Sequence, residues 1–243
     1  MINYNKDYTK RNPSKKYKEL VELYKELHSS SSKIFDGKSL IKFANPIRKI
    51  IEEHNCETLL DYGCGKGYLY TNDYKKVVNA KHLVKPIHEY WKINNPHLYD
   101  PGEEQHSKLP NGVFDIVINT DVLEHIPEDD LVWVLKEIFS YSSNIVFLNI
   151  SCRPAVKTFK NGENVHVSVF PIEDWLQLIA RISEQYPYLT IYVYGDSVDK
   201  NNNAYITAHK VMPRPTIIPI ALSSDIFKLK ENDIDISKVQ RWD

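Results

Sequence analysis

Cysteines, glycines and an excess of charge of either sign are scarce in this sequence of 243 residues. The three cysteines, Cys56, Cys64 and Cys152, form no C-x-x-C pair, which excludes a disulfide framework and suits a reducing compartment. The ligand spacing of a structural zinc site is missing as well, so we expect no metal ion. Lysine and arginine number 31 against 32 aspartates and glutamates, and this formal net charge of −1 argues against a dedicated nucleic-acid-binding protein.

Long apolar runs are also absent. No stretch of about 18 apolar residues occurs, so no membrane-spanning helix and no membrane partner are expected. Residues 1–11 are polar and lack the apolar stretch of a secretory signal, which predicts a cytoplasmic protein. Residues 1–20 carry six basic and two acidic side chains, and this local excess is typical of a solvated helix face.

Helical and strand patterns alternate along the chain. Apolar positions at helical spacing predict helices over 13–28, from 45 onward, after 127–130 and after 171–174. Strands are expected at 58–60, 97–99, 114–119, 145–150, 189–194 and 204–211. The continuous apolar runs at 114–119 and 145–150 are typical of central strands covered on both faces. The pattern predicts a doubly wound α/β fold with a mostly parallel sheet and an antiparallel hairpin at one edge.

Three regions follow from this reading of the chain. Residues 1–44 are expected to form an N-terminal helical segment, and residues 45–212 the α/β domain. Residues 213–243 contain three prolines and balanced charge, and are expected to form a tail that wraps the domain or reaches a neighbouring copy. Formation of a homo-oligomer therefore remains an open alternative.

A glycine-rich loop follows the first expected strand, with the pattern Asp61-x-Gly63-x-Gly65-x-Gly67. Glycines allow tight turns and a close approach of a ligand to the main chain, and a helix expected next would offer free N–H groups to an anion. A phosphate-binding Walker loop is excluded because Lys66 is followed by Gly67 rather than by serine or threonine. A dinucleotide loop is disfavoured, since the third glycine comes one residue early. Binding of S-adenosylmethionine is the remaining interpretation.

Three segments resemble a known family. Residues 59–67, LLDYGCGKG, are similar to the first motif of the class I S-adenosylmethionine-dependent methyltransferases, and residues 114–127, FDIVINTDVLEHIP, to their fourth-strand motif. Residues 164–167 resemble a segment that many small-molecule members carry after the fifth strand. The resemblance covers about residues 45–211. It implies a seven-stranded, mostly parallel, Rossmann-like methyltransferase sheet with an antiparallel last strand, and S-adenosylmethionine as the cofactor.

The resemblance also assigns cofactor-binding residues. Asp61, Gly63 and Gly65 are implied to line the methionine part of the cofactor, and Asp121 and Val122 to lie beside the methionine and the sulfonium. Both groups follow strands of one parallel sheet, where ligands bind outside the carboxyl ends at the topological switch point. We therefore expect one crevice between them.

Asp100 is assigned to the ribose hydroxyls, because a carboxylate at the end of the second strand can accept both hydroxyl hydrogens. It lies 33 residues beyond Gly67, where the analogous acid of dinucleotide-binding folds comes after about 20, which implies an insertion. The 13 residues from 101 to 113 are too few for a helix and a further strand, so we expect a sheet with one edge trimmed. Two alternatives stay open: Asp100 ends the third strand and contacts adenine, or it forms the turn before Pro101.

His125 and His166 are the candidate catalytic residues. Methyl transfer from a sulfonium needs an in-line approach, and a base only where the acceptor keeps a proton at neutral pH. His125 alternatively stabilises the turn before Pro127, and His166 alternatively makes a structural hydrogen bond. In the family, residues before the first motif often form a lid, a role that the resemblance gives to residues 29–40.

Together these features predict a methyltransferase acting on a small polar molecule, such as a sugar or another metabolite. Two alternatives stay open: methylation of RNA or protein, for which the basic N-terminal stretch speaks, and a non-catalytic binding subunit. The Asn/Asp-Pro-Pro-Tyr/Phe motif of nucleobase methyltransferases is absent after the fourth strand, where Asp121-Val122-Leu123-Glu124 stands. A nucleobase acceptor is therefore disfavoured, while the acceptor atom stays open.

Overall fold

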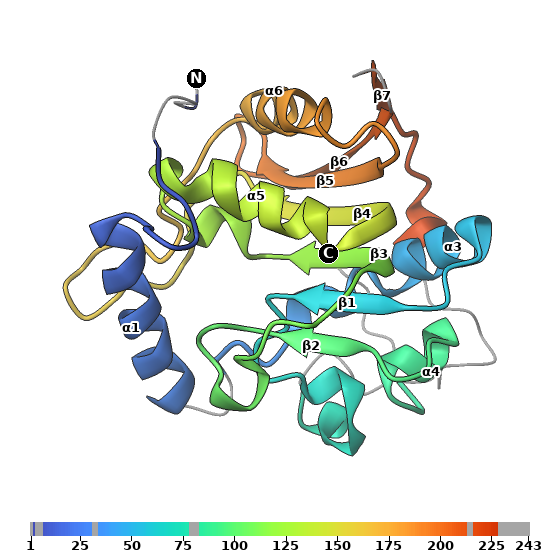
Figure 1. The fold of residues 1–243 in the computed structure, drawn as a ribbon, viewed down its shortest axis with the longest axis horizontal. Helices are drawn as coiled ribbons and strands as arrows, with labels where there is room; N and C mark the ends of the chain where they lie inside the picture. Colours follow the sequence, from blue (N-terminus) through green and yellow to red (C-terminus); the bar gives the residue numbers. More distant parts are fainter. Residues whose placement is uncertain (1, 3–6, 31–33, 78–82, 213–215, 228–243) are drawn as a thin grey trace.

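A seven-stranded sheet with the strand order β2-β1-β3-β4-β5-β6-β7 forms the centre of the computed structural model (Figure 1). The structure describes residues 2, 7–30, 34–77, 83–212 and 216–227. The strands are β1 (Leu59–Tyr62), β2 (His97–Tyr99), β3 (Phe114–Thr120), β4 (Ser142–Ser151), β5 (Thr190–Val198), β6 (Ala204–Met212) and β7 (Thr216–Pro219). Strands β1 to β5 are mutually parallel, whereas β6 is antiparallel to β5 and β7 to β6.

The predicted α/β class and mostly parallel sheet are confirmed, with one difference at the antiparallel edge. The hairpin of β5 and β6 is not the last pair, because Thr216–Pro219, assigned to the tail, adds β7 to the edge. All four residues of β7 are exposed, so this strand has no buried face and leaves no hydrophobic alternation in the sequence. At the opposite edge, β2 is the last strand among the described residues, as expected for a trimmed sheet.

Helices cover both faces of the sheet, and alternate side chains of each strand point to opposite faces. Ile116 of β3 packs in one core with α3 and α4, while the adjacent Val117 packs in the other with α5 and α6. The helices are α1 (Lys15–Ser30), α2 (Lys38–Ile41), α3 (Ala44–His54), α4 (Ile87–Trp91), α5 (Leu131–Ser140) and α6 (Ile172–Ser183). Among the described residues, no helix combines the length and the apolar character needed to cross a membrane.

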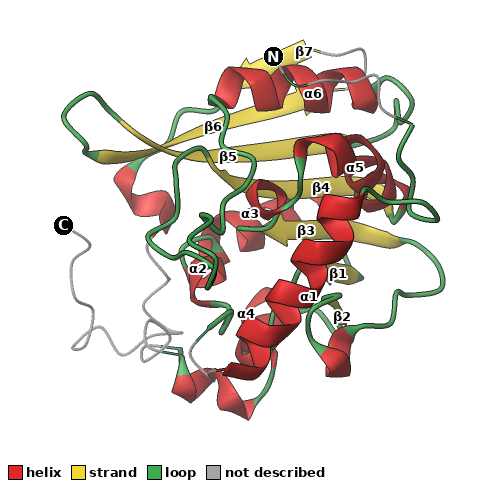
Figure 2. Ribbon diagram, turned by 90° about the vertical axis from the view of Figure 1, so that its left-hand side faces the viewer, coloured by secondary structure: helices red, strands yellow, loops and turns green. Residues whose placement is uncertain are grey.

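Helix α1 belongs to neither layer. It lies beyond the end of the sheet at which β1 and β3 terminate, and Figure 2 shows it crossing in front of that end. Its first turn is held by the buried carboxylate of Asp130, which accepts hydrogen bonds from the Ser14 N–H (3.0 Å) and the Trp133 indole N–H (2.7 Å). The ring of Tyr17 packs edge-on against Trp133 at 5.1 Å. The helical segment before the domain therefore forms a wall at the carboxyl ends of the strands.

The described part of the C-terminal tail packs on its own domain. Besides β7, the Asn45 side-chain amide donates to the Ile226 carbonyl (2.7 Å), and the ring of Phe227 lies 6.4 Å from that of Phe43. The described part of the chain thus follows the wrapping alternative. Residues 228–243 lie outside the described residues.

Ending the chain at Met212 should lower the free energy of unfolding by about 1–3 kcal/mol relative to a chain ending at Phe227, because it unpairs the edge of β6 and the cover of α3. Urea denaturation of the two chains measures the difference, and gel filtration reports association through the bare edge. Equal stability and equal elution would contradict a structural role for residues 216–227.

Candidate active site

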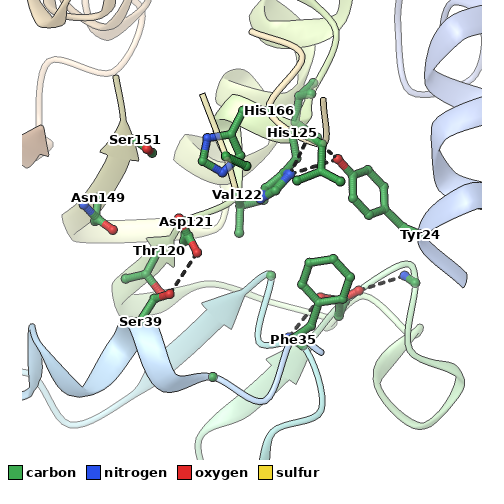
Figure 3. Close-up of a pocket in the computed structure, with 18 of the residues that line it drawn as sticks. Tyr24, Phe35, Ser39, Thr120, Asp121, Val122, His125, Asn149, Ser151 and His166 are labelled. Atoms are coloured by element: carbon green, nitrogen blue, oxygen red, sulfur yellow. Dashed lines mark hydrogen bonds between the residues drawn. The ribbon is translucent and has the colours of Figure 1, made fainter. Parts of the chain in front are cut away.

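A cavity of about 440 Å³ opens beyond the carboxyl ends of β1, β3 and β4, within the usual range for small-molecule sites (Figure 3). It lies at the point where the chain order of the sheet reverses, since β2 and β3 flank β1 on opposite sides. All eight residues that the sequence analysis assigned to a site line this one cavity: Asp61, Gly63, Gly65, Asp100, Asp121, Val122, His125 and His166. Helix α1 and residues 35–43 complete its wall.

The glycine loop makes its closest approaches to the protein itself. Gly63 has φ +98°, and a Cβ there would lie 2.3 Å from Cγ2 of Val122. Gly65 has φ +57°, and a Cβ there would lie 2.3 Å from the Phe35 carbonyl oxygen. The N–H groups of Gly63 and Cys64 both donate to the Tyr99 carbonyl (2.7 and 3.1 Å). The glycines therefore allow the loop to pack between β2, the loop after β3 and the N-terminal segment.

Over the described residues 68–77 no α-helix follows the loop, contrary to the sequence-based expectation. Residues 68–76 form two short 3-10 helices, Tyr68–Tyr70 and Asn72–Lys76, separated by an extended Thr71. The Thr71 hydroxyl accepts a hydrogen bond from the Asp73 N–H (3.2 Å), which starts a new turn instead of continuing the first. The row of free N–H groups expected at a helix N-terminus is therefore missing here.

One carboxylate oxygen of Asp61 lacks a hydrogen-bond donor among the described residues. Its side chain is 1% exposed, and one oxygen, Oδ2, accepts from the Tyr70 hydroxyl (2.7 Å). The other oxygen, Oδ1, has no hydrogen-bond partner among the described residues. Burial raises the pKa of Asp61 to about 7, against the opposing effect of the Tyr70 hydrogen bond. A cationic or hydrogen-donating ligand group in the cavity would complete this carboxylate.

Asp100 joins the turn after β2 to the glycine loop. Its Oδ1 accepts from the Gly102 N–H (2.8 Å), the hydrogen bond that the turn interpretation predicts. Its Oδ2 accepts from the Gly65 N–H (2.9 Å), a contact that sequence reasoning missed. Each oxygen still has a second lone pair, so the structural bonds leave acceptor capacity toward the cavity.

Phe35 closes the cavity from the N-terminal side. Its ring stacks on His28 at 4.7 Å and lies edge-on to Tyr24 at 5.8 Å, while its carbonyl accepts from the Lys66 N–H (3.0 Å). Ser39, four residues on, donates its hydroxyl to Oδ2 of Asp121 (2.8 Å). The expected lid of residues 29–40 thus contacts both the glycine loop and the loop after β3; its residues 31–33 lie outside the described residues.

A buried carboxyl group, Glu124, supports the opposite wall. Its Oε1 accepts from the Ser151 N–H (2.7 Å), and its backbone carbonyl accepts from the N–H groups of Val167 (2.9 Å) and Ser168 (3.0 Å). Burial, followed by the negative charge of Asp121, raises the pKa of Glu124 well above its ordinary value. Burial thus favours the neutral form of Glu124, and the residue fixes the loop after β3, the end of β4 and residues 164–168 together.

Asp121 stays ionised beside this neutral acid. Its backbone has φ +60°, which turns the residue at the end of β3 toward the cavity. Burial alone would raise the pKa of Asp121, but His125, the hydroxyl of Ser39, Glu124 and His166 together hold it below its ordinary value. A negative charge therefore faces the two histidines.

Both histidines point Nδ1 at a backbone carbonyl. Nδ1 of His125 lies 2.9 Å from the Val165 carbonyl, and Nδ1 of His166 lies 2.7 Å from the Arg153 carbonyl. Because a carbonyl oxygen only accepts hydrogen bonds, each Nδ1 carries a hydrogen, so in the neutral form of either ring Nε2 holds the lone pair. Burial lowers the pKa of His125 to about 4, so this ring is neutral at pH 7.

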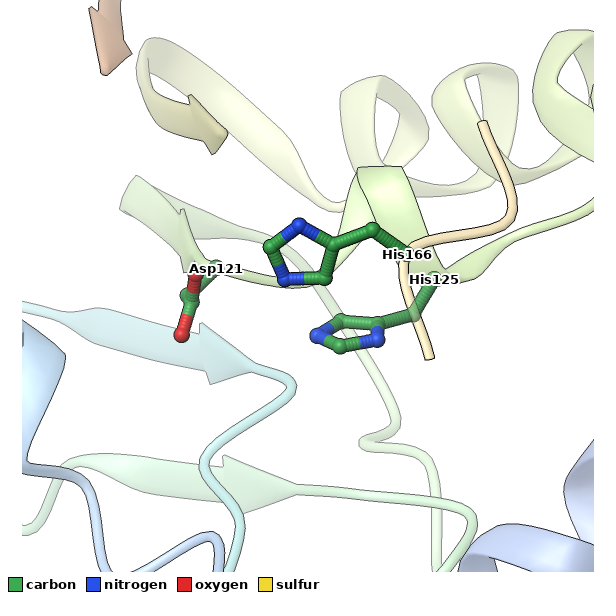
Figure 4. Close-up of side chains that lie close together, drawn as sticks. All are labelled: Asp121, His125 and His166. Carbon is green, nitrogen blue, oxygen red and sulfur yellow. The ribbon is translucent and has the colours of Figure 1, made fainter. Parts of the chain in front are cut away.

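His166 makes the structural hydrogen bond that its alternative predicts, whereas the ring of His125 bonds residue 165 and Tyr24 rather than the turn before Pro127. The ring centroids lie 4.8 Å apart at 86°, and Figure 4 shows both rings beside Asp121. The hydroxyl of Tyr24 on α1 lies 2.9 Å from Nδ1 of His125 and donates to the Val165 carbonyl (2.7 Å). Sequence reasoning missed Tyr24, whose only signal is its place in an apolar helical stripe.

Asp121, His125 and His166 offer one ligand atom each, and these three atoms all lie within 4.8 Å of one another. The expectation of no metal ion rested on cysteine spacing, which does not bear on a cluster of two imidazoles and a carboxylate.

No family model, curated protein or solved structure matches this chain.

Gly63→Ala should lower the free energy of unfolding by about 1–3 kcal/mol more than Gly112→Ala. The two glycines share a positive φ (+98° and +113°), but a Cβ at Gly112 meets nothing within 4 Å, so the contrast isolates the clash with Val122. Urea denaturation of both variants measures it. Equal losses would contradict the tight packing of the loop against Val122.

Proposed function

We propose that this protein is an S-adenosylmethionine-dependent methyltransferase acting on a small polar molecule. The observation that carries the proposal is the convergence of two segments on one cavity at the switch point of the sheet. The glycine loop after β1 and the Asp121–Val122 segment after β3, which resemble two motifs of one family, both line it.

The residues of the cavity suit such a cofactor. Oδ1 of Asp61, buried and without a partner, would accept from the α-ammonium of the methionine part, beside Gly63 and Gly65. Asp100, at the end of the strand next to β1, would accept from the ribose hydroxyls through its remaining lone pairs. Val122 would lie beside the sulfonium, whose methyl group is the electrophile that the cofactor supplies.

The chain's own residues would position the acceptor and exclude water. In their neutral forms His125 and His166, whose Nδ1 atoms bond carbonyls, can accept a hydrogen bond or a proton from an acceptor hydroxyl at Nε2. Phe35 and Tyr24 cover the same part of the cavity with aromatic rings. Positioning of this kind lowers the barrier of a two-substrate reaction by up to about 7–11 kcal/mol.

A small acceptor fits the cavity better than a nucleic acid does. The basic side chains near the N-terminus are partly neutralised within the fold: Lys10 pairs with Glu137 (2.8 Å), Lys16 with Glu163 (2.6 Å) and Lys15 with Glu19 (3.5 Å). The basic stretch therefore supports the solvated-helix interpretation. The position of α1 across the carboxyl ends of the strands also narrows access to the cavity.

Isothermal titration calorimetry with S-adenosylmethionine and S-adenosylhomocysteine tests the proposal, with NAD⁺ as a ligand that should not bind. Asp100→Ala should weaken both complexes by about 10- to 150-fold, as expected for a lost charged hydrogen bond.

Asp199→Ala is the matched control, because Asp199 also forms a turn through a backbone N–H (Asn201, 2.8 Å) but does not line the cavity. Absence of binding to the unaltered protein would overturn the proposal. Equal affinities of the two variants would remove Asp100 from the ribose.

Affinity for the cofactor should rise with pH between 5.5 and 7.5. The pKa of Asp61 is about 7, so below this pH the group is largely protonated and must lose its proton to bind an ammonium. Calorimetry should show binding about five- to tenfold weaker at pH 6 than at pH 7.5, with proton release near pH 6.5. In Asp61→Asn the dependence should flatten; a flat profile for the unaltered protein would contradict contact between Asp61 and the ammonium.

A further inference from the structure

We propose that Asp121, His125 and His166 bind a divalent transition-metal ion in the cavity. Asp121 and His125 lie in one segment and His166 lies 41 residues after His125, yet the three ligand atoms all lie within 4.8 Å of one another (Figure 4). Ligands at about 2.1 Å from one ion lie roughly 3.0–3.5 Å apart, so the widest separation must close by roughly 1–2 Å.

The donor set selects the class of ion. Two imidazole nitrogens and one carboxylate suit zinc, iron, cobalt and nickel, whereas calcium and magnesium prefer sites made of oxygen alone. Two histidines and one carboxylate also leave coordination positions open to a small molecule. The cavity on which all three residues open provides the space for it.

The surroundings of each ligand match those of metal ligands in proteins. A metal-binding histidine donates its second ring N–H to a carbonyl or carboxylate, which fixes the tautomer. His125 does so to Val165 and His166 to Arg153, so both Nε2 atoms are already free to bind an ion. The Ser39 hydroxyl orients the carboxylate of Asp121 in the same way. The correct tautomers therefore exist without the ion.

The cluster has no internal hydrogen bond that would explain it as a purely structural network. The bonds of the two rings run outward to carbonyls and to Tyr24, and the Asp121 carboxylate interacts with the Ser39 hydroxyl and the Glu124 side chain. Among the described residues, no hydrogen bond joins the Asp121 carboxylate to either imidazole. With both rings neutral, one anionic group and two nitrogen lone pairs share one space, and a cation satisfies all three.

The ion would determine the acceptor, a step that rests on the proposed function. An acceptor hydroxyl bound at an open position would have its pKa lowered, so its O–H bond breaks, the proton passes to water and the electron pair stays on oxygen. The two histidines then act as ligands, and no general base is needed. An acceptor with two adjacent oxygens, such as a vicinal diol or a hydroxy acid, fits best because it can chelate the ion.

Titration of the metal-free protein with Co²⁺ and Zn²⁺ tests the site, with visible absorption reporting Co²⁺ and calorimetry reporting Zn²⁺. One equivalent should bind, and Asp121→Asn and His166→Ala should each weaken binding at least about tenfold. His97→Ala is the control. His97 lies on β2, its ring bonds the Lys108 carbonyl, and it does not line the cavity. Binding that is equal in all four proteins, or absent from the unaltered one, would overturn the proposal.

Nitrogen NMR of the histidine rings gives a readout that does not depend on whether a variant folds. On addition of Zn²⁺, the Nε2 resonances of His125 and His166 should shift to metal-bound positions while both Nδ1 atoms keep their hydrogens. Unshifted Nε2 resonances would overturn the site. Calorimetry with S-adenosylhomocysteine on the same sample separates the two proposals, since metal binding without cofactor binding refutes only the proposed function, and the reverse refutes only the metal site.

Discussion

The buried carboxyl group of Glu124 is the constraint on which the arrangement of the cavity depends. It has no exposed surface, its pKa is raised by burial, and its Oε1 accepts the N–H of Ser151. Its carbonyl takes two further N–H groups, from Val167 and Ser168. Three segments that are distant in sequence are thereby fixed to one another, and His166 is carried to a position beside Asp121 and His125. The Tyr24 hydroxyl, bonded to the Val165 carbonyl, holds the same loop against helix α1.

The sequence predicts the core of the fold well because burial leaves a strong mark on composition. Central strands such as β3 contain a run of β-branched apolar residues, Ile116 to Ile118, and α5 repeats apolar residues at helical spacing, so both are recognisable without a structure. Strand β7 is not predicted from the sequence because it depends on pairing with β6 at the sheet edge. The 3-10 helices after Gly67 are not predicted because they depend on the local hydrogen bond of Thr71. Neither effect produces a periodic pattern.

In the site, too, some features are predictable from the sequence and others are not. The eight assigned residues meet in one cavity because the carboxyl ends of parallel strands share an edge, a rule that topology alone supplies. What the sequence cannot supply is long-range contact: the bond from Gly65 to Asp100, the carbonyls that fix both histidine tautomers, and the hydroxyl of Ser39 on Asp121. These contacts decide protonation and orientation, and therefore the chemistry that the assigned residues can perform.

Helix α1 has a consequence for how the cavity exchanges its contents. The helix is anchored at its first turn by Asp130, far from the rings of Tyr24 and His28 that border the cavity at its other end. A molecule bound against this second half of the helix contacts it directly, so binding of the molecule and docking of the helix on the sheet are energetically coupled. By reciprocity, whatever stabilises the helix against the sheet also strengthens binding in the cavity, and whatever fills the cavity stabilises the docked helix. The helix that forms the wall of the cavity thus also influences how tightly the cavity binds its contents.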